Sequence, residues 1–125
     1  MISIEQVLKI HRIAIEKFGG LDGVRDLGGL ESSLARPFQT FAGEDLYSTI
    51  FKKAAAIGES IIMNHPFIDG NKRTGYLLME ALLRTEGYFI ISSDDQLYDF
   101  VISISTGSIS FEDIVDWLQK NTATK

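Results

Sequence analysis

The sequence contains no cysteine and only two histidines among its 125 residues. The lack of cysteine excludes disulfide bonds, thiolate zinc sites and a cysteine nucleophile. With only His11 and His65 available, a metal site built from histidines alone is also disfavoured. A domain of this length buries about two-thirds of its unfolded surface, which is enough for a core without disulfides or a structural metal.

The chain also has no excess of positive charge and no long apolar run. Its net charge is −5, which disfavours a general affinity for DNA or RNA. No apolar run approaches the roughly 18 residues that a membrane span requires. The first residues, Met1–Glu5, show no charged-then-apolar pattern of a signal peptide. We therefore expect a cytoplasmic protein with no direct nucleic-acid or membrane binding.

Apolar residues recur at helical spacing along most of the chain, which predicts five long helices and one short one. Serine followed by glutamine three residues later predicts capped helix starts at Ser3 and Ser93. The first expected helix begins after Ser3, and the short one covers Leu30–Ala35. The next two cover Leu46–Met63, with Asp45 as its cap, and residues 72–86 approximately. The last two run from Ser93 to about Ser105 and from Ser110 to Asn121. A short extended run is expected at Tyr88–Ile91.

The segment Tyr76–Leu83 is apolar almost all round, which is typical of a buried central helix. The sequence thus predicts an all-α fold: a single domain over residues 1–125, with about six helices around that central helix.

The most polar short stretch, His65–Arg73, lies between the two most apolar predicted helices. Because His65 precedes Pro66, its backbone is disfavoured in the α region, so the incoming helix should end there with the imidazole at its exit. Asp69–Gly70 is typical of a turn. Asn71 is a favourable N-cap for the central helix.

Lys72 and Arg73 stand in the first turn of that helix, where a cation opposes the helix dipole at a cost of roughly 0.3–1 kcal/mol each. A helix N-terminus binds anions, and phosphates suit a lysine and an arginine best. Asp69 is a candidate magnesium ligand, and His65 a candidate general base. Together they suffice for transfer of a phosphorus group to a hydroxyl.

Each of these signals taken alone has a structural explanation. A histidine at a helix end is usually a hydrogen-bonding group, Asp-Gly is usually a turn, and basic residues at a helix start are often only solvated. Their concentration within nine residues, between two buried helices, favours the functional interpretation.

The run His65–Arg73 resembles the signature of the Fic/Doc family, most closely the death-on-curing (Doc) branch with its pattern H-x-F-x-[DN]-[AG]-N-K-R. The resemblance implies the α-helical Fic core and a role for each motif residue. His65 would deprotonate a target hydroxyl, Asp69 would hold Mg²⁺, and Phe67 would be structural. Asn71, Lys72 and Arg73, with the backbone near Gly70 and the Asp69-bound metal, would hold the nucleotide phosphates.

The expected reaction depends on which branch of the Fic/Doc family the motif resembles. AMP-transferring Fic proteins carry glycine where Lys72 stands and a second arginine where Tyr76 stands, so both departures point away from AMP transfer. Doc-like proteins bind ATP in the reverse sense and transfer its terminal phosphoryl group to a threonine of elongation factor Tu, which stops translation. The resemblance therefore implies an ATP-dependent protein phosphotransferase toxin. An AMP transferase of the same fold and a catalytically silent module that binds an anion or a partner remain as alternatives.

Regulation is also implied by the resemblance. Many Fic proteins carry an inhibitory helix with the pattern [ST]-x-x-x-E-[GN]. The sole candidate here is Glu86–Gly87, and Leu82 stands where the serine or threonine is required. Doc proteins are restrained instead by a separate antitoxin whose C-terminal segment folds onto the toxin, so such a partner is expected near the site.

Other residues give weaker signals. The glycine-rich segment Gly19–Phe41 could serve as a flap that aligns the target chain, or could be a connector holding a structural Arg–Asp pair. Its charged residues are Arg25, Asp26, Glu31 and Arg36. We expect His11 at the surface, Trp117 in the core with Phe111 and Leu118, and Tyr76 and Glu80 at the border of the site.

Overall fold

The computed structural model describes residues 2–124, and most of these residues are helical. The α-helices are α1 (Ile4–Phe18), α2 (Leu27–Ala35), α3 (Ile50–Asn64), α4 (Asn71–Arg84), α5 (Asp94–Ser105) and α6 (Phe111–Lys120), with a 3₁₀ turn, η1 (Arg36–Phe38), after α2. Two short antiparallel pairs join β1 (Thr40–Phe41) to β2 (Glu44–Asp45) and β3 (Tyr88–Ile90) to β4 (Thr122–Thr124). The predicted all-α fold with about six helices is confirmed in this part of the chain.

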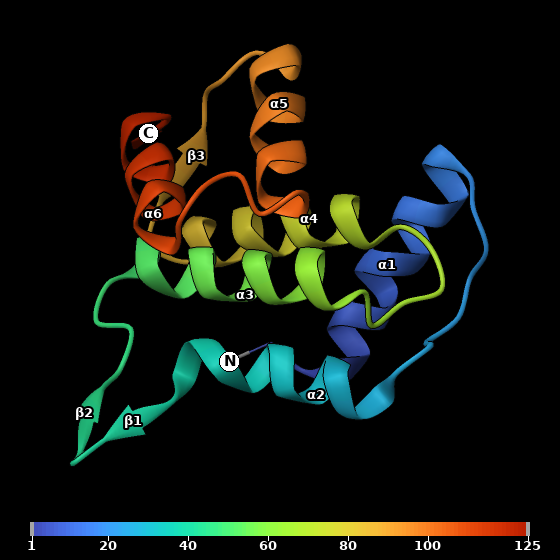
Figure 1. Cartoon of the computed structure of the whole chain (residues 1–125), viewed down its shortest axis with the longest axis horizontal. Helices are drawn as coiled ribbons and strands as arrows, with labels where there is room; N and C mark the ends of the chain where they lie inside the picture. The colour runs from blue at the N-terminus through green and yellow to red at the C-terminus, as the bar shows by residue number, and fades with distance from the viewer. Residues whose placement is uncertain (1, 125) are drawn as a thin grey trace.

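Helices α3 and α4 run side by side through the middle of the molecule (Figure 1). Helices α1 and α2 cover the pair from one side, and α5 and α6 cover it from the other (Figure 1). The loop that joins α3 to α4, residues 65–70, lies at one end of the pair, where the chain between α1 and α2 also passes. None of the described helices is long and apolar enough to cross a membrane.

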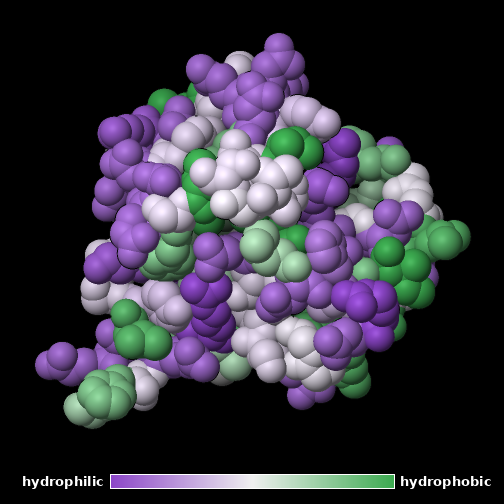
Figure 2. Space-filling model, in the orientation of Figure 1, coloured by the Kyte–Doolittle hydropathy of each residue, from purple (hydrophilic) through white to green (hydrophobic). Residues whose placement is uncertain are grey.

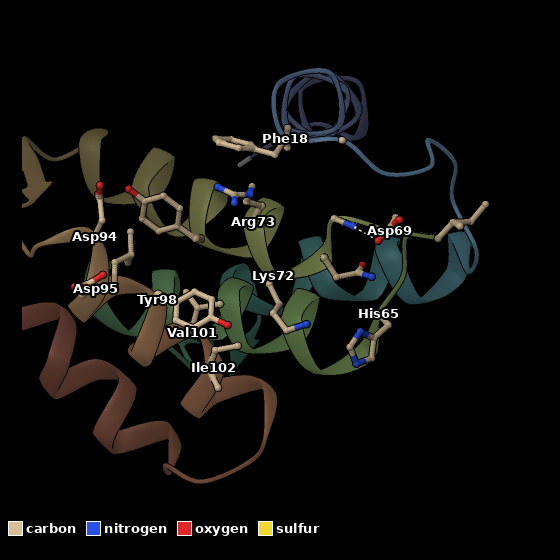
Figure 3. A pocket seen from close by; sticks show the side chains of 17 residues that line it. Phe18, His65, Asp69, Lys72, Arg73, Asp94, Asp95, Tyr98, Val101 and Ile102 are labelled. Atoms are coloured by element: carbon tan, nitrogen blue, oxygen red, sulfur yellow. Dashed lines mark hydrogen bonds between the residues drawn. The ribbon is translucent and has the colours of Figure 1, made fainter.

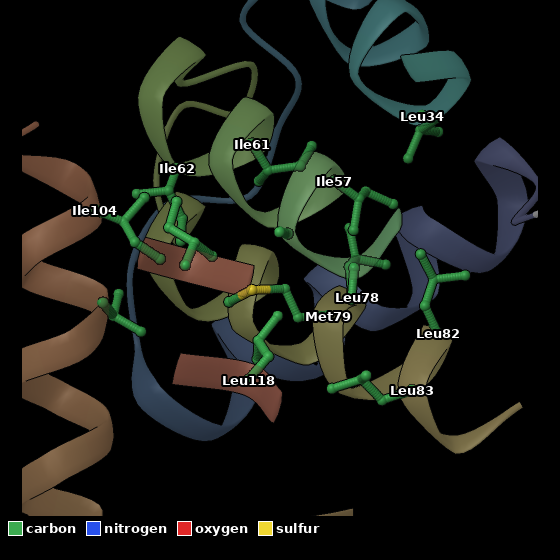
Figure 4. Close-up of a cluster of buried hydrophobic side chains, with 14 of the residues drawn as sticks. Leu34, Ile57, Ile61, Ile62, Leu78, Met79, Leu82, Leu83, Ile104 and Leu118 are labelled. Atoms are coloured by element: carbon green, nitrogen blue, oxygen red, sulfur yellow. The ribbon is translucent and has the colours of Figure 1, made fainter. Parts of the chain in front are cut away.

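The two central helices approach closely because each presents a glycine to the other. A Cβ added at Gly58 would lie 2.3 Å from Met79 Sδ, and one added at Gly75 would lie 2.6 Å from Ile62 Cγ1. Neither position therefore has room for a side chain unless its neighbour moves. The surrounding side chains complete one core, in which Figure 4 draws residues such as Ile57, Leu78 and Leu83, all fully buried. The loop between α3 and α4 thus begins and ends on a rigid pair.

Local capping sets several helix ends where the sequence predicts them. Ser3, Ser93 and Ser110 each accept a hydrogen bond from the backbone three residues on, and each forms a complete capping box. Helix α1 ends at Gly19, whose φ of 86° favours glycine. The expected packing of the last helix is also confirmed, because Leu118 is buried and Trp117 stacks on Phe100 with ring centroids 3.8 Å apart.

The start of α3 differs from the prediction. The helix begins at Ile50 with Thr49 as its N-cap, not at Leu46 with Asp45 as its cap. Asp45 instead lies in β2, where it pairs with Thr40 and accepts a hydrogen bond from Lys53 at 3.1 Å. The antiparallel pair therefore takes the predicted cap, and residues 46–49 connect β2 to α3 without helical structure.

Helix α2 starts three residues earlier than predicted, at Leu27. Asp26 caps it by accepting a hydrogen bond from the backbone of Gly29 at 2.9 Å. This cap offsets the poor helix propensity of Gly28 and Gly29 in the first turn.

Candidate active site

The loop between α3 and α4 begins with an unusual backbone conformation at His65. Helix α3 ends at Asn64 as predicted, and His65 takes a left-handed conformation with φ 50° and ψ 56°. A residue with a side chain in this region is held at a cost of ~1–3 kcal/mol, which surrounding contacts must offset. The His65 side chain is exposed and lines a cavity next to the loop.

Two buried hydrogen bonds between Asn71 and Phe67, here called the bracket, close the loop. The Asn71 side chain accepts a hydrogen bond from the backbone nitrogen of Phe67 at 2.9 Å and donates one to its carbonyl oxygen at 3.0 Å. Asn71 is the first residue of α4, and Gly70 is the N-cap, with φ 77°. The prediction of Asn71 as N-cap is therefore wrong, because its amide binds the backbone of Phe67 instead. Phe67 is buried and structural, as expected.

The start of α4 presents positive charge and free amides to the cavity. The first hydrogen bond of the helical ladder runs from Thr74 to Gly70, so the backbone amides of residues 71–73 precede it. Lys72 and Arg73 are exposed there, and neither forms an ion pair with any carboxylate of the described residues. The Arg73 guanidinium lies 3.4 Å from the centroid of the Phe18 ring, which is a cation–π contact. This end of α4 is suited to bind a multiply charged anion.

Asp69 faces the same cavity with an exposed carboxylate. One of its oxygens accepts a hydrogen bond from the backbone of Leu21 at 3.2 Å, and the other accepts one from Gly70 at 3.3 Å. Within residues 2–124 there is no cluster of three or more metal-ligating side chains. One carboxylate beside a phosphate site fits Mg²⁺, which keeps several waters and binds through one or two carboxylates plus substrate phosphates.

His11, expected at the surface, is buried beneath this turn. It is 1% exposed, and its ring stacks on Phe67 with centroids 3.9 Å apart and planes 7° apart. Its Nε2 lies 2.8 Å from the carbonyl oxygen of Asp69, so the ring N–H donates to that oxygen. On the other side, Nδ1 lies 3.4 Å from Asp22. The signal that could have found His11 is its spacing from Val7 and Ala14, which places it on the buried stripe of α1.

The cavity has a volume of about 910 Å³ and extends from the loop to α5. Figure 3 shows His65 and Asp69 at one end, Lys72 and Arg73 in the middle, and Tyr98 with Asp94 and Asp95 on α5 toward the other end. The motif residues line one cavity, as the sequence predicts, whereas the α5 wall and Phe18 were not predicted because both are distant from the motif in sequence.

Tyr76 and Glu80 were both expected at the border of the site. Tyr76 does line the cavity, whereas Glu80 is not part of the cavity wall. Burial, followed by a hydrogen bond to Glu80, raises the pKa of Tyr76 well above its usual range. The Tyr76 phenol is therefore neutral at physiological pH.

Only the first part of the segment Gly19–Phe41 reaches the site. The alternative of a structural Arg–Asp pair within this segment is not found among the described residues. Asp26 caps α2, while the Arg25 side chain donates to the carbonyl oxygens of Asn64 and His65. Arg36 contacts Glu59 and Ser60 on α3 instead, at 3.0 and 2.9 Å. Phe41 lies in the β1–β2 hairpin, which projects from the side of the molecule opposite the loop between α3 and α4 (Figure 1).

Fold and loop together define a known class: the chain belongs to the Fic/DOC family, whose model matches residues 1–83, including the whole motif. Similar curated proteins place it in the Doc branch. It is 40% identical over 91 residues to "Toxin Doc" of Mycolicibacterium smegmatis, covering 73% of this chain and 68% of that protein. It is 30% identical over 119 residues to "Protein kinase doc" of Escherichia phage P1, covering 95% of this chain and 93% of that protein.

Proposed function

We propose that the protein is a Doc-type toxin that transfers the terminal phosphoryl group of ATP to a threonine hydroxyl of elongation factor Tu and so inhibits translation. The observation that carries this proposal is the pair of cations at the start of α4, which has no carboxylate partner among the described residues and lies beside exposed His65 and Asp69. The kinase name of a relative that aligns with 95% of the chain supports the same reaction.

In the proposed reaction, His65 accepts the proton of the target hydroxyl as its oxygen attacks the terminal phosphorus. A new oxygen–phosphorus bond forms, the bond to the bridging oxygen of ATP breaks, and ADP leaves. Lys72, Arg73 and the free amides of α4 balance the charge on the phosphates. Asp69 would hold Mg²⁺, which when bound neutralises phosphate charge.

The shape of the cavity supports a nucleotide that is bound with its terminal phosphoryl group at the His65 end. With the terminal phosphoryl group beside His65, the remaining phosphates would follow the start of α4, and the nucleoside would lie toward Tyr98 and Val101 on α5. The side chain of Lys72 points into the space between these two ends (Figure 3).

We also propose that an antitoxin covers this site in the cytoplasm, as the toxin name of a relative suggests. Three large apolar side chains at the rim are at least half exposed: Phe18 (51%), Leu21 (67%) and Ile68 (52%). Figure 2 shows apolar surface at this edge of the molecule, over the end of α1 and the segment that follows. A folding peptide could bury such a patch on binding.

The reaction is tested with ATP labelled separately on its α- and γ-phosphates, mixed with bacterial extract and Mg²⁺. We expect label from the γ-phosphate alone, on a band at the position of elongation factor Tu, and its loss with His65→Ala. Arg84→Ala, a change at the far end of α4, should leave the transfer intact. Label from the α-phosphate would identify an AMP transferase. Absence of label, with active controls, would support a silent binding module.

A further inference from the structure

Arg25 lies outside the motif yet binds its first residues directly. Its Nε donates to the carbonyl oxygen of His65 at 2.9 Å, and Nη2 donates to the carbonyl oxygens of Asn64, at 3.0 Å, and of His65. The backbone N–H groups of Arg25 and Asp26 donate to the carbonyl oxygen of Pro66 at 2.8 and 3.0 Å. One short segment therefore holds three successive carbonyl groups at the end of α3.

These contacts meet two local needs of the chain. The last carbonyl groups of a helix have no donors within the helix, and a cation near them also complements the helix dipole. In addition, the left-handed conformation of His65 is unfavourable for a residue with a side chain, so it needs support from outside the helix. The backbone conformation of His65 sets the direction in which its Cα–Cβ bond leaves the chain.

Arg25 forms no ion pair and no side-chain hydrogen bond among the described residues other than those to the end of α3. Its neighbour Asp26 is committed to the cap of α2, and no ion pair of Arg25 occurs between residues 2 and 124. The Arg25 side chain is exposed, so it adds little to the buried core.

We propose that Arg25 is a positioning residue for the transfer reaction: its guanidinium holds the His65 backbone in the left-handed conformation that places the imidazole in the cavity. The catalytic consequence rests on the proposed function, but the effect on the His65 backbone does not. Lys72 and Arg73 belong to α4 and are held independently, so nucleotide binding should not depend on Arg25.

The kinetic test compares Arg25→Ala and Arg25→Lys with the control Arg84→Ala, which removes an exposed arginine at the far end of α4. For Arg25→Ala we expect kcat at saturating ATP to fall roughly 100-fold, the effect of a displacement of about 1 Å at a reacting group. The Kd for ATP should stay within about twofold, because the phosphate contacts are intact.

Two rescue experiments separate positioning from a general structural role. Millimolar guanidinium ion should restore part of the kcat of Arg25→Ala but none of that of His65→Ala. Arg25→Lys should give an intermediate kcat, because an ammonium can donate to these carbonyl oxygens without the planar fork of arginine. Unchanged kcat in Arg25→Ala would overturn the proposal. So would a joint loss of kcat, ATP affinity and melting temperature that guanidinium does not reverse.

A second measurement tests the positioning without any transfer. The ¹³Cα and ¹³Cβ chemical shifts of His65 report its backbone conformation, and in Arg25→Ala we expect them to move from left-handed toward averaged values. Shifts identical to those of the original chain would overturn the proposal even if activity fell. If the original chain transfers no phosphate, the proposed function fails, yet these shifts still decide whether Arg25 holds His65.

Discussion

Replacing His11 with phenylalanine tests whether a buried side chain controls the Asp69 carboxylate, the proposed magnesium ligand. The substitution keeps an aromatic ring against Phe67, where the centroids are 3.9 Å apart, but removes the hydrogen bond to the carbonyl oxygen of Asp69. Leaving that partly buried oxygen without a donor should cost about 1–3 kcal/mol of unfolding free energy. The retained ring avoids the larger cost of an open cavity.

The same change should loosen the turn that carries the Asp69 carboxylate. Losing a partner that orients a metal ligand typically weakens metal affinity by roughly 10–100-fold. We therefore expect the Mg²⁺ concentration for half-maximal phosphoryl transfer to rise by at least about tenfold in His11→Phe. The assay is a Mg²⁺ titration at saturating ATP, with unfolding free energy measured in parallel by urea denaturation.

Leu118→Ala provides the matched control. Leu118 is fully buried in α6, away from the loop, and its truncation should cost about 2–5 kcal/mol. The control should therefore lose stability without changing the Mg²⁺ requirement. If His11→Phe lost stability but kept the original Mg²⁺ requirement, His11 would be a core residue only, and the reasoning about the turn would be refuted.

Two further substitutions test other contacts. Phe18→Leu removes the aromatic face beneath Arg73, a contact worth ~0.5–1 kcal/mol at an exposed site, so ATP affinity measured by calorimetry should fall about two- to fivefold. Phe18→Tyr should restore it, and equal affinity in all three chains would contradict the role of the ring. Gly75→Ala forces a methyl group to within 2.6 Å of Ile62, which should cost about 1–3 kcal/mol by overpacking, less about 1 kcal/mol gained in helix propensity. Urea denaturation measures the net loss, and a more stable variant would show that α3 and α4 separate easily.

The sequence predicts those features of the fold that depend on residues close together in the chain. The capping boxes at Ser3 and Ser93, and the helix start at Ser110, were found because donor and acceptor lie three residues apart. The motif residues were found for the same reason, since one loop and the first turn of α4 carry them all. The residues that distinguish the two branches of the family, Lys72 and Tyr76, can likewise be identified without a structure.

Features that depend on residues far apart in the sequence were either not predicted or predicted wrongly. His11 was expected at the surface because its stacking partner, Phe67, comes 56 positions later in the chain. The contacts of Arg25 were not predicted, because its acceptors are 39 and 40 residues away. Asn71 has the right side chain for an N-cap, but two hydrogen bonds to Phe67 determine its position. In each case a tertiary contact overrides the local preference.

The bracket between Asn71 and Phe67 fixes the shape of the loop, whereas other residues carry its chemistry. Both residues that hold the loop are buried, whereas Asp69 and Lys72, which face the cavity, are exposed. An exposed side chain can be exchanged without disturbing the buried frame that carries it. A substitution at Asp69 or Lys72 can therefore change what the cavity binds, with no change in the path of the backbone.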